Sequence, residues 1–137
     1  MFKLVKTLTT WWPVKVYEPD PERPGTFQEQ EFEIEFEILD REEVKKNQKD
    51  RRDLLAEYET DTTEARLAEL QEKLDALQER DFKRVVRNWR GVIDDDKQPL
   101  AFTNEVLLLA LKRDHVREGI SVAYSEAIDT GKARLGN

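Results

Sequence analysis

A strict alternation of apolar and acidic residues is the clearest pattern in the chain, and it runs from position 31 to position 38. The apolar members are Phe32, Ile34, Phe36 and Ile38, and the acidic members are Glu31, Glu33, Glu35 and Glu37. Successive side chains of a β-strand point to opposite faces, so this pattern predicts a strand with its phenylalanines and isoleucines in the core. The same pattern places all four glutamates in solvent.

A second strand is predicted upstream, between Leu4 and Tyr17, where apolar and polar residues also alternate. Pro13 predicts an edge position or a kink in it, because proline has no amide hydrogen for a neighbouring strand. Residues 18–25 hold three prolines and a glycine and are therefore expected to be a loop. The two strands form an antiparallel β-hairpin over residues 1–39, and helices are expected to cover it because an isolated hairpin is marginal in water.

Two charged helices are predicted next, as an antiparallel helical hairpin over residues 41–79. Asp40 followed three residues later by Glu43 matches a capping-box variant, which predicts a helix over residues 41–58. In a second helix, over residues 64–79, leucines recur at three-four-three spacing and lie on one row. This leucine row consists of Leu67, Leu70, Leu74 and Leu77. It is too short for an independent coiled coil.

The apolar pattern then shifts phase near Arg80 and predicts that helical structure continues, after a bend or stutter, to a C-cap at Gly91. We expect three apolar residues of this stretch to anchor the C-terminal part of the fold. They are Phe82, Val86 and Trp89.

Two more helices are predicted beyond an acidic turn at residues 94–99. The stretch from Val106 to Leu111 is apolar on all sides, which predicts burial on more than one side and a place as the central core helix. The last helix is expected to begin at Asp114 and to end at Gly131. The predicted fold is therefore α+β, with an N-terminal antiparallel β-hairpin packed on a mainly α-helical body that includes a charged helical hairpin.

Length favours a single domain over residues 1–137, made of the β-hairpin (1–39), the charged helical hairpin (41–79) and a C-terminal helical part (80–131). The formal net charge of −7 opposes binding to the phosphate backbone of nucleic acids. No stretch approaches the roughly 20 apolar residues of a membrane span, and the first ten residues do not resemble a secretory signal. Because the chain has no cysteine, a reducing, cytoplasmic location is expected.

Residues that could support catalysis or metal binding are few. Asp94, Asp96 and Glu105 occupy positions one, three and twelve of a calcium-loop pattern, but position six, which demands glycine, is Pro99. His115 is the only histidine, so no two-histidine zinc site can form, and we expect a surface or capping role for it. The sequence favours a non-enzymatic binding protein with no catalytic residue, metal or cofactor.

Partner contacts are expected on apolar residues that the chain's own fold leaves exposed. In a strand, the adjacent Trp11 and Trp12 point to opposite faces, so one joins the core and the other is exposed. Tryptophan is enriched at interface hot spots, which makes Trp11 and the leucine row the predicted partner-binding residues. The alternative is that both tryptophans pack against the helices. Whether the leucine row is buried, and whether the chain forms a homo-oligomer, is left open by the sequence.

The segment from Phe82 to Ala127 resembles the tail assembly chaperones of long-tailed bacteriophages and prophages. The most similar parts are Trp89-Arg90-Gly91-Val92, which precedes acidic residues, and Pro99-Leu100-Ala101-Phe102-Thr103, which follows them. Pro13-Val14 in the first strand and residues 32–39 leading into Glu42-Glu43 add to the resemblance. Relatives often have a glycine in the acidic turn, where this chain has Lys97.

The resemblance implies that the chain binds the phage tape measure protein, with the tail tube protein as a further candidate partner. It implies that the chain keeps this long helical client soluble in the cytoplasm of the bacterial host until the tail tube polymerises. Many relatives also occur in a longer, frameshifted form, for which Gly131-Lys132 is a candidate slippage site. The alternative is a structural tail or neck component of a phage particle, in which the hairpin adds strands to a neighbouring subunit.

Overall fold

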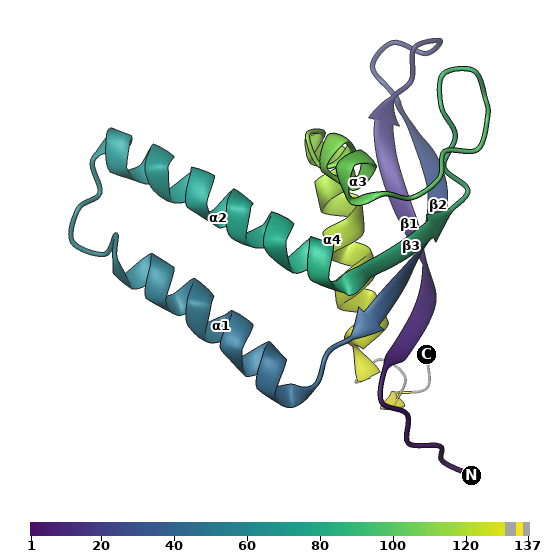
Figure 1. Cartoon of the computed structure of the whole chain (residues 1–137). Helices are drawn as coiled ribbons and strands as arrows, with labels where there is room; N and C mark the ends of the chain where they lie inside the picture. Colours follow the sequence, from purple (N-terminus) through teal and green to yellow (C-terminus); the bar gives the residue numbers. More distant parts are fainter. Residues whose placement is uncertain (131–133, 136–137) are drawn as a thin grey trace. The chain divides into compact units, whose positions relative to one another are not determined.

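The computed structural model describes residues 1–130 and 134–135 and has an α+β fold, which confirms the predicted class (Figure 1). Its elements are β1 (Leu8–Pro19), β2 (Phe27–Ile38), α1 (Arg41–Ala56), α2 (Glu64–Val85), β3 (Val86–Arg90), α3 (Asn104–Ala110) and α4 (Asp114–Ile128). The chain divides into two compact units. The sheet unit comprises Met1–Ile38 and Val86–Asn137, and the helical arm comprises Leu39–Val85.

In the sheet unit, β1 and β2 form the predicted N-terminal hairpin and pair along their whole length. β3 pairs with the other side of β2, so the antiparallel sheet has the order β1-β2-β3. Ile34 and Phe36 of the central strand are fully buried, which confirms that the apolar side of the alternation faces the core. β1 is an edge strand, as Pro13 predicts, but it begins at Leu8 instead of Leu4.

One glutamate of the alternation is buried. Glu37 is only 9% exposed, and Arg87 of β3 donates a hydrogen bond from Nη1 to its Oε1 at 3.1 Å. A buried carboxylate requires such a partner, because removing a charge from water without compensation is costly. The prediction of four solvent-facing glutamates was therefore wrong at Glu37.

The stretch after Val85 is a strand where the sequence pattern predicted a helix up to Gly91. Val86 and Trp89 are both buried, although residues three apart in a regular strand face opposite sides. The register explains this, because Val86 pairs with Phe36 whereas Asn88 pairs with Glu35, which leaves one extra residue on β3. Such a bulge turns Val86 and Trp89 to the same face and imitates a helical spacing.

Gly91 ends this strand rather than a helix. Its φ of 82° lies in the left-handed region, which lets the chain turn away from β2 directly after Arg90.

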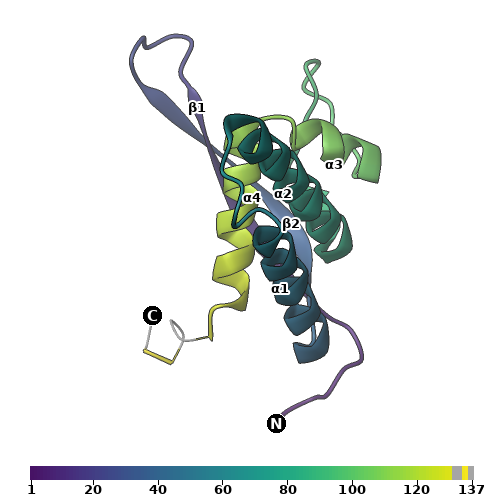
Figure 2. The same ribbon diagram turned by 90° about the vertical axis from the view of Figure 1, so that its left-hand side faces the viewer.

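α4 is the main helix on the sheet, and both views show it lying along β1 (Figures 1 and 2). Gly119, Ile120 and Ala123 form its buried face. A Cβ built at Gly119 would lie 2.7 Å from the backbone oxygen of Lys15, so only glycine allows this close approach. The predicted end of the helix at Gly131, like the Gly131-Lys132 pair, lies outside the described residues.

The helix around Val106–Leu111 is not buried on all sides. α3 begins at an N-cap, where the Thr103 hydroxyl accepts a hydrogen bond from the Val106 amide, and it buries Leu107. Leu109 is 59% exposed, so the prediction of a central core helix was wrong. A helix of seven residues makes only two turns, and its neighbours cover one of its sides.

In the helical arm, α1 and α2 form the predicted antiparallel hairpin (Figure 1). Asp40 caps α1 as predicted, since its Oδ1 accepts a hydrogen bond from the Glu43 amide at 2.9 Å. α1 ends at Ala56 and α2 extends to Val85, beyond the predicted limit of 79. Tyr58 is buried, with the Arg66 guanidinium 4.1 Å from its ring centroid.

Candidate partner-binding surfaces

The leucine row lies on α2 and remains partly open to solvent. Leu67 is 47% exposed, and Leu70, Leu74 and Leu77 are half-buried. The buried residues of α2, Phe82 and Val85, lie near its C-terminal end. The arm therefore presents a continuous apolar row on an otherwise charged helix.

Ion pairs join the two helices of the arm. No residue of α1 is buried, while Arg80 pairs with Asp50 at 2.9 Å and Arg84 pairs with Glu43 at 2.8 Å. The hydrogen bond to Asp50 raises the pKa of the Arg80 guanidinium. Exposed ion pairs of this kind contribute only about 0–1 kcal/mol each. These two ion pairs therefore add little to the stability of the arm.

Trp11 and Trp12 point to opposite faces of β1, as the strand pattern predicts. Trp12 donates a long hydrogen bond of 3.4 Å from Nε1 to Glu126 of α4. Trp11 contacts Arg90 instead, whose Cζ lies 4.1 Å from the Trp11 ring centroid. Both are half-buried. The role of Trp11 in partner binding stays a prediction.

Arg90 is fixed over Trp11 by a two-pronged ion pair with Glu33. Its Nε and Nη2 donate to the two carboxylate oxygens at 2.9 and 3.3 Å. The hydrogen bond from Arg90 lowers the pKa of the Glu33 carboxyl and raises the pKa of the Arg90 guanidinium. Trp11 thus carries a positioned cation on its ring. Tryptophan and arginine are both enriched at interface hot spots.

The three predicted anchor residues are all buried, but they belong to different units. Val86 and Trp89 lie on β3 in the sheet unit, and Phe82 lies on α2 in the helical arm. Trp89 donates from Nε1 to the backbone oxygen of Leu100 at 2.8 Å, and its ring meets Phe102 edge to face at 5.3 Å. These contacts tie the loop after β3 to the sheet.

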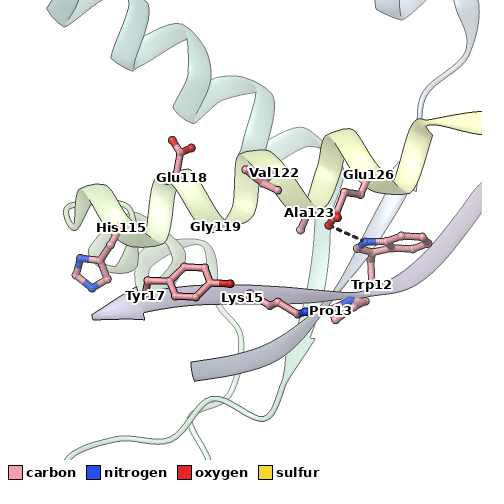
Figure 3. A pocket seen from close by; sticks show the side chains of 10 residues that line it. All are labelled: Trp12, Pro13, Lys15, Tyr17, His115, Glu118, Gly119, Val122, Ala123 and Glu126. Atoms are coloured by element: carbon pink, nitrogen blue, oxygen red, sulfur yellow. Dashed lines mark hydrogen bonds between the residues drawn. The ribbon is translucent and has the colours of Figure 1, made fainter. Parts of the chain in front are cut away.

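A groove of about 660 Å³ between α4 and β1 was not foreseen from the sequence (Figure 3). The residues that shape this α4–β1 groove include Trp12, Tyr17, Glu118, Gly119, Val122 and Glu126. They lie about a hundred positions apart in the chain, so no local pattern could join them. The only hint in the sequence was Gly119 in the middle of a helix, which often marks close packing.

Asp94, the first aspartate of the acidic turn, forms its hydrogen bonds within the turn. Oδ1 of Asp94 accepts hydrogen bonds from the amides of Asp96 and Gln98 at 2.9 and 3.0 Å.

His115 of α4 faces Glu18 of β1, with Nε2 and Oε2 3.3 Å apart. Within residues 1–130 and 134–135, no three His, Cys, Asp or Glu side chains gather as a potential metal site.

Lys97 has a backbone conformation that favours glycine. Its φ is 60°, within a tight turn closed by a bond from the Lys97 amide to the Asp94 oxygen at 3.0 Å. The left-handed region costs a residue with a Cβ about 1–2 kcal/mol. We therefore expect Lys97→Gly to raise the free energy of unfolding of the sheet unit by about 0.5–1 kcal/mol, as measured in urea.

All three tryptophans, at positions 11, 12 and 89, lie in the sheet unit, so tryptophan fluorescence reports its unfolding. The control is Asp96→Gly, at a neighbouring position of the same turn without a positive φ, which should lower stability. An unchanged or lower stability of the Lys97→Gly variant would contradict the prediction.

No helix among the described residues is both long enough and apolar enough to cross a membrane. Comparisons with protein-family models, with curated proteins and with solved structures found no match to this chain.

Proposed function

We propose that the chain is a phage tail assembly chaperone that binds the tape measure protein and keeps it soluble during tail assembly. The half-exposed leucine row on α2 is the observation that carries the proposal. A client helix with apolar residues at positions i, i+3, i+4 and i+7 can pack along such a row. The resemblance of the segment from Phe82 to Ala127 to this family supports the same assignment.

The leucine row offers so little binding free energy that a client would bind it reversibly. Complete burial of a leucine contributes about 1.5–3 kcal/mol, so four half-covered leucines offer on the order of 4 kcal/mol. The loss of translational and rotational freedom on association costs about as much or more. One copy therefore binds weakly, and a long client with many apolar stripes requires several copies. Weak individual contacts allow the chaperone to leave when the tail tube forms around the client.

Replacing both Leu70 and Leu74 with aspartate is expected to abolish the gain in client solubility. Two carboxylates in the middle of the leucine row would lose their hydration when a client helix packs on them. The measurement is the soluble yield of the tape measure protein from the same phage genome, co-expressed with either form of the chain. Far-UV circular dichroism should show an unchanged helix content, because both leucines are only half-buried.

The matched control is Leu109→Asp, which places the same charge on an exposed leucine of α3 and should leave the soluble yield unchanged. If the wild-type chain gives no gain in soluble client, the proposed function is wrong. If the double variant unfolds, the leucine row is core and not a contact surface.

Mass spectrometry of purified particles separates the proposal from the alternative of a structural tail component. A chaperone leaves before the particle is complete and should be absent from it. A stoichiometric amount of the chain in the particles would favour the structural component.

A further inference from the structure

The first seven residues, which we call the N-terminal segment (residues 1–7), leave their apolar side chains uncovered. Phe2 and Leu4 are each 86% exposed. In an extended chain these two side chains point to the same side, because the period is two residues. Lys3 and Lys6 give the segment two positive charges. An apolar and basic extended segment is complementary to a groove with an apolar floor and acidic rims.

The α4–β1 groove has such a lining (Figure 3). Its floor includes the small residue Gly119, and the apolar side chain of Val122 beside it is 49% exposed. The lining contains two carboxylates, of Glu118 and Glu126, one lysine, Lys15, and the imidazole of His115, so its carboxylates outnumber its lysine. Trp12 and Tyr17 lie toward opposite ends of the groove and add aromatic surface.

The segment of the same molecule cannot occupy this groove along its length. It continues directly into β1 at Leu8, so it would have to reverse at Lys6 and Thr7 and run back antiparallel to β1. Counting back from a two-residue turn there places Phe2 opposite Trp11 and Leu4 opposite Thr9, and neither of these β1 residues lines the groove. A two-residue hairpin turn also needs positive φ angles, which favour Asn and Gly over Lys and Thr.

A segment from a second molecule has no such restriction. Seven extended residues span about 23 Å, whereas the distance along β1 from Trp12 to Tyr17 is about 17 Å at 3.3 Å per residue. We propose that the α4–β1 groove binds the N-terminal segment of a second copy of this chain, with Phe2 and Leu4 against the groove floor. When both copies exchange their segments, the result is a closed two-fold dimer. The inference does not rest on the proposed function.

Light scattering after size-exclusion chromatography tests for the dimer, using the full chain at increasing concentration. The wild type is expected to dimerise, and Phe2→Asp/Leu4→Asp is expected to weaken the dimer by at least about tenfold in Kd. Val122→Asp in the groove should have the same effect. Higher salt should also weaken the dimer, because charges of opposite sign meet in the groove. The control Phe27→Asp, at an exposed residue of β2 outside the groove, should leave it unchanged.

Cysteine cross-linking locates the contact, since the chain has no cysteine of its own. A Leu4→Cys form is mixed with a differently tagged Val122→Cys form under mild oxidation with glutathione. The mixed disulfide should form at least about tenfold faster than between Leu4→Cys and Leu109→Cys, because a disulfide needs Cα atoms within about 7 Å.

Three results would overturn the inference. The first is a wild-type chain that stays monomeric at every concentration. The second is a dimer that survives both the segment and the groove variants. The third is a disulfide between Leu4→Cys and Val122→Cys that forms no faster than the one between Leu4→Cys and Leu109→Cys. This cross-linking result tests the inference even if Val122→Asp fails to fold.

Discussion

Replacing Phe36 with alanine is expected to lower the free energy of unfolding of the sheet unit by about 3–5 kcal/mol. Phe36 is fully buried on the central strand, and its ring meets Tyr124 of α4 edge to face at 5.3 Å. Truncation removes the transfer free energy of the ring and leaves a cavity between sheet and helix. A single domain is stable by only about 5–15 kcal/mol, so this one change removes a large part of the total.

Urea denaturation followed by tryptophan fluorescence measures the effect, because all three tryptophans lie in the sheet unit. The chain supplies a matched control in Phe27→Ala. Phe27 is the first residue of the same strand and is 69% exposed, so its loss should change stability by less than about 0.5 kcal/mol. Equal effects of the two substitutions would show that the core does not lie where the structure places it.

Replacing Gly119 with leucine is expected to destabilise the sheet unit by about 3 kcal/mol or more. Gly119 lies where α4 packs closely on β1, and an added Cβ would be 2.7 Å from the Lys15 backbone oxygen and 3.1 Å from Cγ2 of Val16. A backbone atom cannot move aside as a flexible side chain does, so the helix must shift away from the strand. Gly119→Ala gains about 1 kcal/mol in helix propensity, but the same clash should still make it destabilising.

The same urea experiment applies, and Ser125→Leu is the control on the same helix. Ser125 is exposed, so the larger side chain should be tolerated there within about 0.5 kcal/mol. The close approach of α4 to β1 would be disproved if Gly119→Leu were as stable as the wild type.

The two proposals have a common physical consequence, although each is tested separately. A dimer would carry two leucine rows, and linked weak sites bind a long client with higher avidity than one site does. A monomeric variant that still folds should then need a higher concentration to keep the client soluble.

Local patterns were sufficient for the elements that a few neighbouring residues specify. The alternation at Phe32–Ile38 predicted β2 because one side of that strand faces the core and the other does not. Asp40 predicted the start of α1, since an N-cap acts within one turn of the helix. The three-four-three spacing predicted that the leucine row lies on one side of α2.

The errors share a single cause, which is contact between distant segments. Val86 and Trp89 have helical spacing, yet their segment pairs with β2 as a strand. A bulge in that strand turns both side chains to the same face. The alternation predicts an exposed side chain at Glu37, but this side chain is buried. Arg87 of β3 donates a hydrogen bond to its carboxylate. The apolar helix around Leu109 has too few neighbours to bury more than one of its sides.

The sequence by itself determined the α+β class, the hairpin, the capped charged helices and the position of the leucine row, because those features depend on the periodicity of adjacent side chains. Only the tertiary structure decided how far the leucine row is exposed, that Arg90 lies over Trp11, and that α4 and β1 enclose a groove. Each of these features depends on contacts between residues far apart in the chain. The local periodicity of the sequence does not predict such contacts.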